Sequence, residues 1–569
     1  MPQDAFTLKF LCEELSGLFK GGKVNRIIQP SNDEIVMTVY TGKRTEKLLI
    51  DVNPASPRIG VTLEEKDSPL TAPNFCMLMR KHLLSSTVLG VELVGFDRIV
   101  KIDFLSSGEF FDAVKKTLYV ELMGRYSNVI LTEDGKVLGG NRGINMFDNG
   151  VRPLIVNKPY VFPPVGNKKT PSDLDLLTTF SNCDKSDLVN VICANVQGLA
   201  TSTAKEIVST FIEKFGSLET NNFPQEFFDH LNSYIYQTKS NPCVIFSSGE
   251  VTDVCVYPYD VLGGEFEYFE KLYLAEEYYF TERQKIKQYK SKRERLISVI
   301  SAAIKKVKKR LTAITAKERD AESAEENRIK GELLLANIYR FKGGEKECEL
   351  DNYYDGSKVK ITLDKRLSLA KNAENYYKKY NKQKRTLTAL KPQREQAETE
   401  LKYFTSILDE IELAETILDL TMVQKELESA GLLVEKRVTT KKRKEDESFC
   451  RVYDVCGFIV RAGRNNAEND KLTFTAKQDD IWVHAKDYHS SHVLVESSGK
   501  EVPESVITIA AEISAYYSKG RCGGKTEVVY TKRKNVKKPP RSKPGFCIYE
   551  NFKSVMVEPQ KHQELLKDV

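Results

Sequence analysis

The sequence predicts a multidomain α+β protein, and three observations lead to this fold class. The chain has 569 residues, enough for roughly three to five domains of ~100–200 residues each. Short strand-like patterns fill residues 1–170 and return from residue 446 onwards. Between them, residues 281–430 carry apolar positions at alternating three- and four-residue spacing, which is typical of a long coiled coil.

Residues 1–170 predict an N-terminal α+β domain. Apolar residues at helical spacing predict a helix from about Leu8 to Phe19, and Pro73 suits the first turn of a second helix that ends near Leu84. The expected strands are Glu34–Tyr40, Lys47–Val52, Val91–Phe96, Ile99–Phe104, Leu118–Leu122 and Val129–Leu131. Asp97-Arg98 and Gly124-Arg125-Tyr126 lie between paired strands, so we expect both at turns of the sheet.

Residues 171–225 predict a compact helical domain. The expected helices are Asp173–Thr179, Lys185–Ala194 and Ala200–Phe215. Gly198 lies in a short turn between two of them, as in a helix-hairpin-helix unit, where the turn aims backbone N–H groups at a phosphate. A plain helical linker is the alternative interpretation, because a single glycine between helices is common.

The centre of the chain predicts an arm. One helix is expected from about Phe280 to Tyr339 and a second from about Leu369 to Ala430, with Pro392 kinking or dividing it. Two long helices joined by a turn fold back on each other as an antiparallel pair. Arg293 and Arg310 occupy seam positions and are expected to extend their charges to the edge. Residues 226–280 and 431–445 are assigned to a middle domain.

Residues 446–569 predict a C-terminal α+β domain. The expected strands are Val452–Val460, Ile481–Val483, Glu527–Tyr530 and, last, Phe546–Tyr549. A helix is expected over Pro503–Ser518.

Basic residues are segregated along the chain. Residues 281–310 hold twelve Lys or Arg against two Glu, and residues 531–543 hold seven and no acid. A third basic run comprises Lys436, Arg437, Lys441, Lys442, Arg443 and Lys444. The whole chain carries only +6, so the remainder is acidic. Such segregation favours a polyanionic partner, nucleic acid above a membrane surface, over a solvated charged face of mixed sign.

Several kinds of chemistry are excluded or weakly supported. No apolar run approaches the ~20 residues of a membrane span, and Asp4, Glu13 and Glu14 lie where a signal peptide needs an apolar core. The 11 Cys form no C-x-x-C pair, so we expect a cytoplasmic protein with reduced thiols. The loop Gly520–Thr526 lacks the spacing of a nucleotide-binding loop. His484, His489 and His492 cluster near Trp482, which favours hydrogen bonding and stacking over a metal site.

Motifs distributed along the whole chain resemble the NFACT family, whose bacterial members are ribosome-associated quality-control proteins earlier described as fibronectin-binding proteins. They include VGFDRIVKI at Asp97-Arg98, YVELMGRYSNVIL at Tyr119–Leu131, KGELLLANIYRF with DNYYDG at Lys330–Gly356 and NAENYYKKYNKQKR at Asn372–Arg385. GRNNAENDKLT with DDIWVHAKD at Gly463–Asp487 and NVKKPPRSKPG at Asn535–Gly545 follow. One departure is His489-Ser490-Ser491-His492, where the family usually reads P-G-S-H.

The resemblance implies a domain order and a function. The order is a glycosylase-like N-terminal α+β domain, a helix-hairpin-helix domain, a coiled coil with a small middle domain and a C-terminal RNA-binding domain. The implied partners are large ribosomal subunits (rRNA and proteins) obstructed by peptidyl-tRNA, alanyl-tRNA for template-free alanine tailing of the stalled chain, and a small RNA-binding helper protein. The alanine tail marks that chain for degradation. No catalytic residue, cofactor or metal is expected, because the ribosome forms the peptide bond.

The resemblance also implies two sets of site residues. Those expected to bind tRNA are Asp4, Asp97, Arg98, Glu121 and Arg125. Those expected to bind RNA in the C-terminal domain are Trp482, His484, Lys486, His492, Lys532, Arg533, Lys534, Lys537 and Lys538. Carboxylates accept from base N–H groups or a 2′-OH, and Arg forks onto phosphate or stacks on a base. Asp97-Arg98 could instead form a surface salt bridge in a hairpin, and Trp482 could be a core residue.

Two functions of different classes remain as alternatives. One is a surface adhesin for fibronectin, against which the missing signal peptide argues. The other is a DNA glycosylase-like enzyme, suggested by the implied scaffold and by Pro2, whose amine could act as a nucleophile after removal of Met1.

Overall fold

A computed structural model describes residues 3–107, 113–142, 152, 154–341, 344–434, 450–540 and 542–566. The chain divides into two compact units, Met1–Lys285 and Ile286–Val569, here called the N-terminal and C-terminal units. The finer five-part division stays a prediction. No helix among these described residues is both long and apolar enough to cross a membrane.

A nine-stranded antiparallel sheet organises the N-terminal unit, in the order β4-β3-β2-β1-β5-β6-β7-β8-β9. The strands are β1 (Lys23–Ile28), β2 (Glu34–Tyr40), β3 (Thr45–Asp51), β4 (Arg58–Val61), β5 (Thr87–Leu93), β6 (Ile99–Ser107), β7 (Ala113–Glu121), β8 (Asn128–Glu133) and β9 (Lys136–Gly140). Sequence reasoning found neither β1 nor β4. Along β7, more buried residues alternate with more exposed ones, so that one face of this strand is turned to the core.

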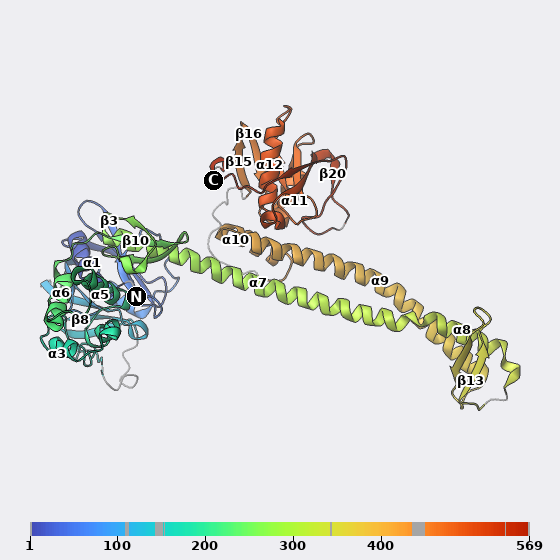
Figure 1. The fold of residues 1–569 in the computed structure, drawn as a ribbon, viewed down its shortest axis with the longest axis horizontal. Helices are drawn as coiled ribbons and strands as arrows, with labels where there is room; N and C mark the ends of the chain where they lie inside the picture. Colours follow the sequence, from blue (N-terminus) through green and yellow to red (C-terminus); the bar gives the residue numbers. More distant parts are fainter. Residues whose placement is uncertain are drawn as a thin grey trace. The chain divides into compact units, whose positions relative to one another are not determined.

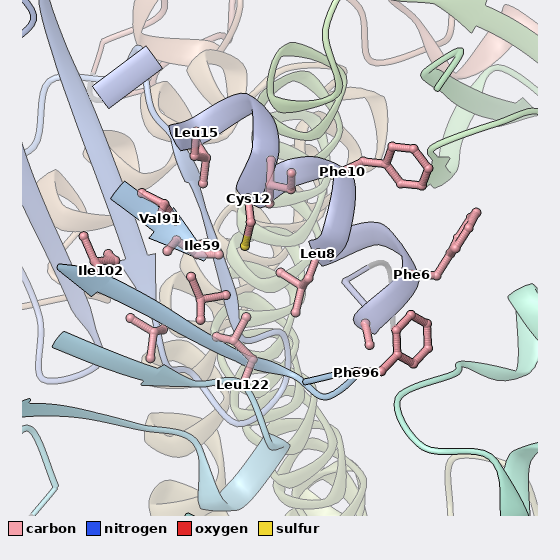
Figure 2. Close-up of a cluster of buried hydrophobic side chains, with 14 of the residues drawn as sticks. Phe6, Leu8, Phe10, Cys12, Leu15, Ile59, Val91, Phe96, Ile102 and Leu122 are labelled. Carbon is pink, nitrogen blue, oxygen red and sulfur yellow. The ribbon is translucent and has the colours of Figure 1, made fainter. Parts of the chain in front are cut away.

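Helix α1 (Ala5–Phe19) forms the centre of this core because it is apolar on nearly all sides. Leu8, Cys12 and Leu15 point toward the strands, whereas Phe6 and Phe10 point the other way (Figure 2). There the Phe6 ring lies 5.5 Å from the ring of Tyr234, on α6 (Phe223–Gln237). One helix thus joins the sheet to the helical domain.

The helical domain packs on this same core. Its helices are α3 (Asp175–Ser181), α4 (Leu188–Asn195), α5 (Thr201–Phe215) and α6, and α2 (Asn74–Leu83) belongs to the sheet domain. A small sheet follows, with β10 (Cys243–Ser247) between β11 (Glu250–Cys255) and β12 (Glu265–Tyr268).

The long helices differ from their expected bounds. Helix α7 spans Leu272–Glu322 and begins eight residues earlier than expected, because Leu272, Ala275 and Tyr279 are buried against the N-terminal unit. It ends at Glu322, and a separate helix, α8 (Ala324–Ala336), follows. Helix α9 (Leu369–Leu413) contains Pro392 without being divided there, so the expected division at Pro392 is wrong. The break falls instead before α10 (Ile417–Ser429).

Within the C-terminal unit, α7 and α9 lie side by side (Figure 1) and share one hydrophobic cluster, which includes Leu296, Ile300 and Ile407. Arg310 pairs with Glu400, and Arg394 pairs with Glu318, so the two helices run in opposite directions. Arg310 is exposed, as expected for a charge that extends to the edge. These features are consistent with the predicted coiled coil. The hairpin β13 (Glu347–Asp351) and β14 (Lys358–Thr362) packs with α8 and the start of α9.

A six-stranded antiparallel sheet forms the end of the chain, in the order β15-β16-β18-β17-β19-β22. Its strands are β15 (Arg451–Val455), β16 (Phe458–Ala462), β17 (Ile481–Ala485), β18 (Val493–Val495), β19 (Thr526–Lys532) and β22 (Lys553–Val557). Helices α11 (Asn466–Thr475) and α12 (Glu504–Tyr516) and the short pair β20 (Val536–Lys537) and β21 (Ile548–Tyr549) complete this domain. The single strand expected over Val452–Val460 is wrong, since a turn at Cys456-Gly457 divides it.

We predict that Gly198→Ala destabilises α5 far more than Gly216→Ala does. Both glycines have a φ of +78°, so both substitutions carry the ~1–2 kcal/mol cost of a left-handed alanine. Only at Gly198 would the new Cβ also lie 2.4 Å from the Phe96 carbonyl oxygen. Hydrogen exchange of the α5 amides should show that their free energy of opening falls by about 2–4 kcal/mol in Gly198→Ala and by about half that or less in Gly216→Ala. An equal fall in both variants would mean that the Phe96 carbonyl oxygen does not restrict the side chain at position 198.

Candidate nucleic-acid interface

A cleft of about 430 Å³ in the N-terminal unit brings together three of the residues expected to bind tRNA, Asp4, Asp97 and Arg98. They come from the start of α1 and from the loop between β5 and β6. The turn between α4 and α5 supplies the facing wall, including Gln197 and Gly198. Residues separated by about a hundred positions therefore meet at one site.

Asp4 shapes this cleft from a buried position. One carboxylate oxygen accepts from the Thr7 backbone N–H at 2.9 Å and so caps α1. The other accepts from the Ala200 backbone N–H at 3.0 Å and from the Thr203 hydroxyl at 2.7 Å. Asp4 is only 2% exposed. In this structure the Asp4 carboxylate holds the N-terminus of α5, and the tRNA-binding role expected of Asp4 stays a prediction.

This arrangement changes the expected role of the helix-hairpin-helix turn. The Ala200 N–H, one of the donors that a phosphate would use, is taken by Asp4. The Gly198 carbonyl accepts from the Ala5 N–H at 2.8 Å. The turn thus serves first to join the two domains.

Asp97 and Arg98 lie at the exposed side of the cleft. Asp97 accepts from its neighbour's backbone N–H at 2.7 Å and from the Gln197 side chain at 3.0 Å. The Arg98 carbonyl accepts from the Leu122 N–H at 2.9 Å, which fixes the Arg98 backbone against the sheet. Asp97 therefore joins the β5–β6 loop to Gln197 of the α4–α5 turn, next to the fixed backbone of Arg98.

Lys168 is a second cation of the cleft that sequence reasoning missed. Its ammonium group donates to the Cys193 carbonyl at 2.8 Å, and this partner is neutral. The positive charge of an exposed Lys168 is therefore available to an anion. Its only sequence signal was the dipeptide Lys168-Lys169 after a proline-rich stretch. Arg98 and Lys168 together suit a phosphate group.

Glu121 is buried, whereas Arg125 is exposed. Glu121 is 2% exposed and accepts from both terminal nitrogens of Arg152, at 3.0 and 2.6 Å, and from the Tyr160 hydroxyl at 2.6 Å. The Glu121 carboxylate thus has partners within the protein, and its expected role in tRNA binding stays a prediction. Arg125 is exposed, with its guanidinium carbon 4.7 Å from the centre of the Tyr126 ring. It is accessible to a partner, and its role stays a prediction.

The C-terminal domain buries the aromatic residues that were expected to bind RNA. Trp482 is 0% exposed and His492 1%. The His484 ring stacks on Trp482 with centroids 5.4 Å apart, and a ring nitrogen of His492 lies 2.7 Å from the Thr473 hydroxyl. Trp482 and His492 are therefore buried in this domain, and the RNA-binding role expected of each stays a prediction.

The basic residues of this domain are on the surface but have acidic neighbours. Lys486 pairs with Glu527 at 3.0 Å, Lys532 with Asp479 at 3.3 Å and Lys537 with Glu550 at 3.4 Å. Lys538 pairs with Asp470, whereas Arg533 donates to the carbonyls of Thr473 and Phe474. Lys534 is exposed. Exposed pairs of this kind contribute ~0–1 kcal/mol, so a phosphate can replace the acidic partner.

The third basic run, from Lys436 to Lys444, lies outside the described residues, as does Pro2. The glycosylase alternative therefore lacks a structural account of its proposed nucleophile. Among the described residues, no group of three His, Cys, Asp or Glu side chains could hold a metal ion.

We predict that the C-terminal domain loses stability as the pH falls from about 6.5 toward 4. Burial lowers the pKa of His484 to about 4 and that of His489 to about 3, and it also lowers the pKa of His492. The unfolded chain, with histidine pKa values near ~6.5, binds more protons in that range, so acid favours unfolding. His484 alone accounts for roughly 3 kcal/mol.

Trp482 is the only tryptophan of the chain, so its fluorescence reports this transition directly. His484→Phe keeps a ring against the indole but removes the titration, and it should shift acid unfolding to lower pH. If the pH midpoint of unfolding is the same in His484→Phe as in the wild type, protonation of His484 does not contribute to acid unfolding.

Comparison with known proteins identifies the family. The model of the NFACT N-terminal and middle domains matches residues 4–446, and that of the NFACT protein RNA binding domain matches residues 448–546. The protein named "Rqc2 homolog RqcH" from Bacillus subtilis (strain 168) is 31% identical over 565 residues, covering 96% of each chain. Its namesake from Streptococcus suis (strain 05ZYH33) is 28% identical over 572 residues, covering 98% of each chain.

One solved structure is also similar in part. It is the N-terminal part of the fibronectin/fibrinogen-binding protein from Streptococcus suis, with a TM-score of 0.42 and 22% identity. The match covers 49% of this chain and 98% of that one. The two family models together span nearly the whole chain, and the chain belongs to the NFACT family.

Proposed function

We propose that this protein is a cytoplasmic ribosome quality-control factor. It binds large ribosomal subunits that are obstructed by peptidyl-tRNA and recruits alanyl-tRNA for template-free alanine tailing of the stalled chain. Both of these relatives are named "Rqc2 homolog RqcH", and this name supports the ribosomal role. The matched RNA-binding domain supports an RNA partner.

The observation that carries the proposal is the braced Arg98 of the cleft. Arg98 has a fixed backbone, an ordered neighbour in Asp97 and a second cation, Lys168, in the same cleft. A guanidinium binds phosphate or stacks on a base, and a fixed backbone lowers the entropic cost of placing it there. The cleft of 430 Å³ is open on one side, which suits one or two nucleotides of a larger RNA rather than a free small molecule.

The protein acts in this proposal as a holding and delivery factor. Peptide bond formation stays with the ribosome, so the chain needs to position tRNA and stay on the subunit. The exposed lysines at 532, 534, 537 and 538 suit contacts to rRNA phosphates. A small RNA-binding helper protein is part of the proposed assembly.

Two variants are expected to separate these roles. Asp97→Ala with Arg98→Ala should abolish alanine tailing in a reconstituted assay and leave cosedimentation with obstructed large subunits within about twofold. Lys532→Ala, Lys534→Ala and Lys537→Ala together should weaken cosedimentation and reduce its dependence on salt, because up to three phosphate contacts are removed. Arg44→Ala, which removes an exposed cation that pairs with Glu46, is the control and should change neither.

The measurements are tail length by mass spectrometry and pelleting through sucrose at several salt concentrations. Tailing by the Asp97/Arg98 variant, or loss of both activities in that variant while it stays folded, would contradict the proposed division of roles.

A further inference from the structure

Three aromatic rings pack together beside the cleft. Tyr119 lies on β7, and the segment 154–164 brings Tyr160 and Phe162 against it. The Tyr119 and Tyr160 rings stack with centroids 4.0 Å apart and an interplanar angle of 7°. The Phe162 ring meets both edge-on, at 5.7 and 5.0 Å. Phe162 is 46% exposed, so a large part of this apolar cluster faces solvent.

Glu121 fixes the orientation of this cluster from below. Its buried carboxylate accepts from the Tyr160 hydroxyl and from Arg152, and the Arg152 guanidinium carbon also lies 5.2 Å from the centre of the Tyr160 ring. An ionised carboxylate in so buried a place needs all of these donors, so the three groups hold one another in a single arrangement. The exposed Phe162 therefore rests on a support that is already ordered.

The segment that carries Tyr160 and Phe162 is basic in sequence, and it continues into the cleft. Residues 157–169 include Lys158, Lys168 and Lys169 and no acidic residue. Pro164 and Val165, directly after Phe162 and Pro163, line the same cleft as Arg98 and Lys168. An exposed aromatic ring thus lies on the same continuous segment as Lys168, one of the two cations of the cleft.

We infer that Tyr119, Tyr160 and Phe162 form a stacking platform for an unpaired RNA base whose backbone runs toward Arg98 and Lys168. Phe162 contacts the base, and Glu121 is a positioning residue that acts through Tyr160. Aromatic side chains next to a cationic track are the usual means by which proteins hold single-stranded RNA. The inference rests on the proposed function only in naming tRNA as the source of the unpaired base.

Because Glu121 holds Tyr160 in place, it can matter for RNA binding without touching RNA. A protein partner would also cover an exposed phenylalanine. Lys169 in this segment pairs with Asp175 at 2.7 Å, but exposed Lys168 donates only to a neutral carbonyl, which favours a polyanion instead.

The test uses the full-length protein and a short oligoribonucleotide that carries 2-aminopurine, both unpaired and annealed to its complement. Phe162→Ala should weaken binding of the unpaired strand about tenfold and remove the quenching of 2-aminopurine that stacking causes. The slope of log K against log salt should not change, since no charge is removed. Tyr236→Ala, which truncates an exposed aromatic residue on α6, is the control and should bind like the wild type. Unchanged affinity of Phe162→Ala, or an equal loss for the duplex, would overturn the platform.

A double-mutant cycle tests the positioning role of Glu121. Glu121→Ala should weaken binding of the unpaired strand severalfold in the wild type and add no loss to Phe162→Ala, because both act on one contact. Additive losses would mean that Glu121 acts independently of the platform. Tyr160→Phe keeps all three rings and removes only the hydrogen bond from the Tyr160 hydroxyl to Glu121. We expect this variant to fold like the wild type. It should weaken binding at least twofold, and wild-type affinity would overturn the role of this hydrogen bond.

The platform and the proposed function fail separately. Binding of the unpaired strand through Phe162 in a protein that performs no tailing would contradict the tailing role alone. Tailing by a wild-type protein whose affinity for unpaired RNA does not depend on Phe162 would contradict the platform alone.

Discussion

The N-terminal unit depends on one buried carboxylate, that of Asp4. It caps α1, holds the N-terminus of α5 and bonds the Thr203 hydroxyl, so three hydrogen bonds converge on two oxygens. A buried carboxylate without such donors would be strongly destabilising, whereas one with donors from two domains fixes their relation. The α4–α5 turn is thereby placed against the β5–β6 loop, close enough for Gln197 to bind Asp97.

The residue before Asp4 extends this junction to the long helix. The Gln3 side chain bonds both backbone groups of Ile59, at 2.7 and 2.9 Å, and donates to Glu276 on α7 at 2.7 Å. Burial raises the pKa of Glu276 to about 8, which favours its neutral form at physiological pH. Two consecutive residues therefore tie the cleft, the sheet and the base of α7 together.

The C-terminal unit uses the same principle with paired charges. Asp419, in the first turn of α10, binds Arg451 at 2.8 Å and Arg464 at 2.5 Å, both from the RNA-binding domain. Burial alone would raise the pKa of Asp419, but the two guanidinium groups hold it below its usual value. Buried ion pairs add little net stability, yet breaking one leaves an unpaired charge, so they fix how α10 and this domain meet.

Patterns local in sequence predicted much of the fold. The helix from about Leu8 to Phe19, strand β2 and the start of α9 at Leu369 were all expected, because each combines a periodic apolar pattern with a suitable boundary. Helix α11 was missed because its buried face is polar: Asn466, Asn469 and Thr473 pack where a sequence pattern looks for apolar residues. Strand β22 was missed because only Val557 is fully buried.

The sequence indicated which residues belong to the site, but it did not indicate which of their side chains are buried. Asp97 and Arg98 do lie in the cleft, whereas Asp4, Glu121 and Trp482 are buried supports. The acidic partners of the C-terminal lysines were invisible in sequence, since Asp479 and Asp470 are 53 and 68 residues away from Lys532 and Lys538. Such long-range pairs follow from the tertiary fold and from no local pattern.

Binding of tRNA at the cleft can be tested by cross-linking the protein to RNA in cells, sequencing the RNA and mapping the linked peptides. We expect large-subunit rRNA and enriched tRNA, with tRNA linked to peptides that line the cleft of Arg98 and Lys168. Recovery of no RNA, or of RNA without tRNA at these peptides, would contradict it.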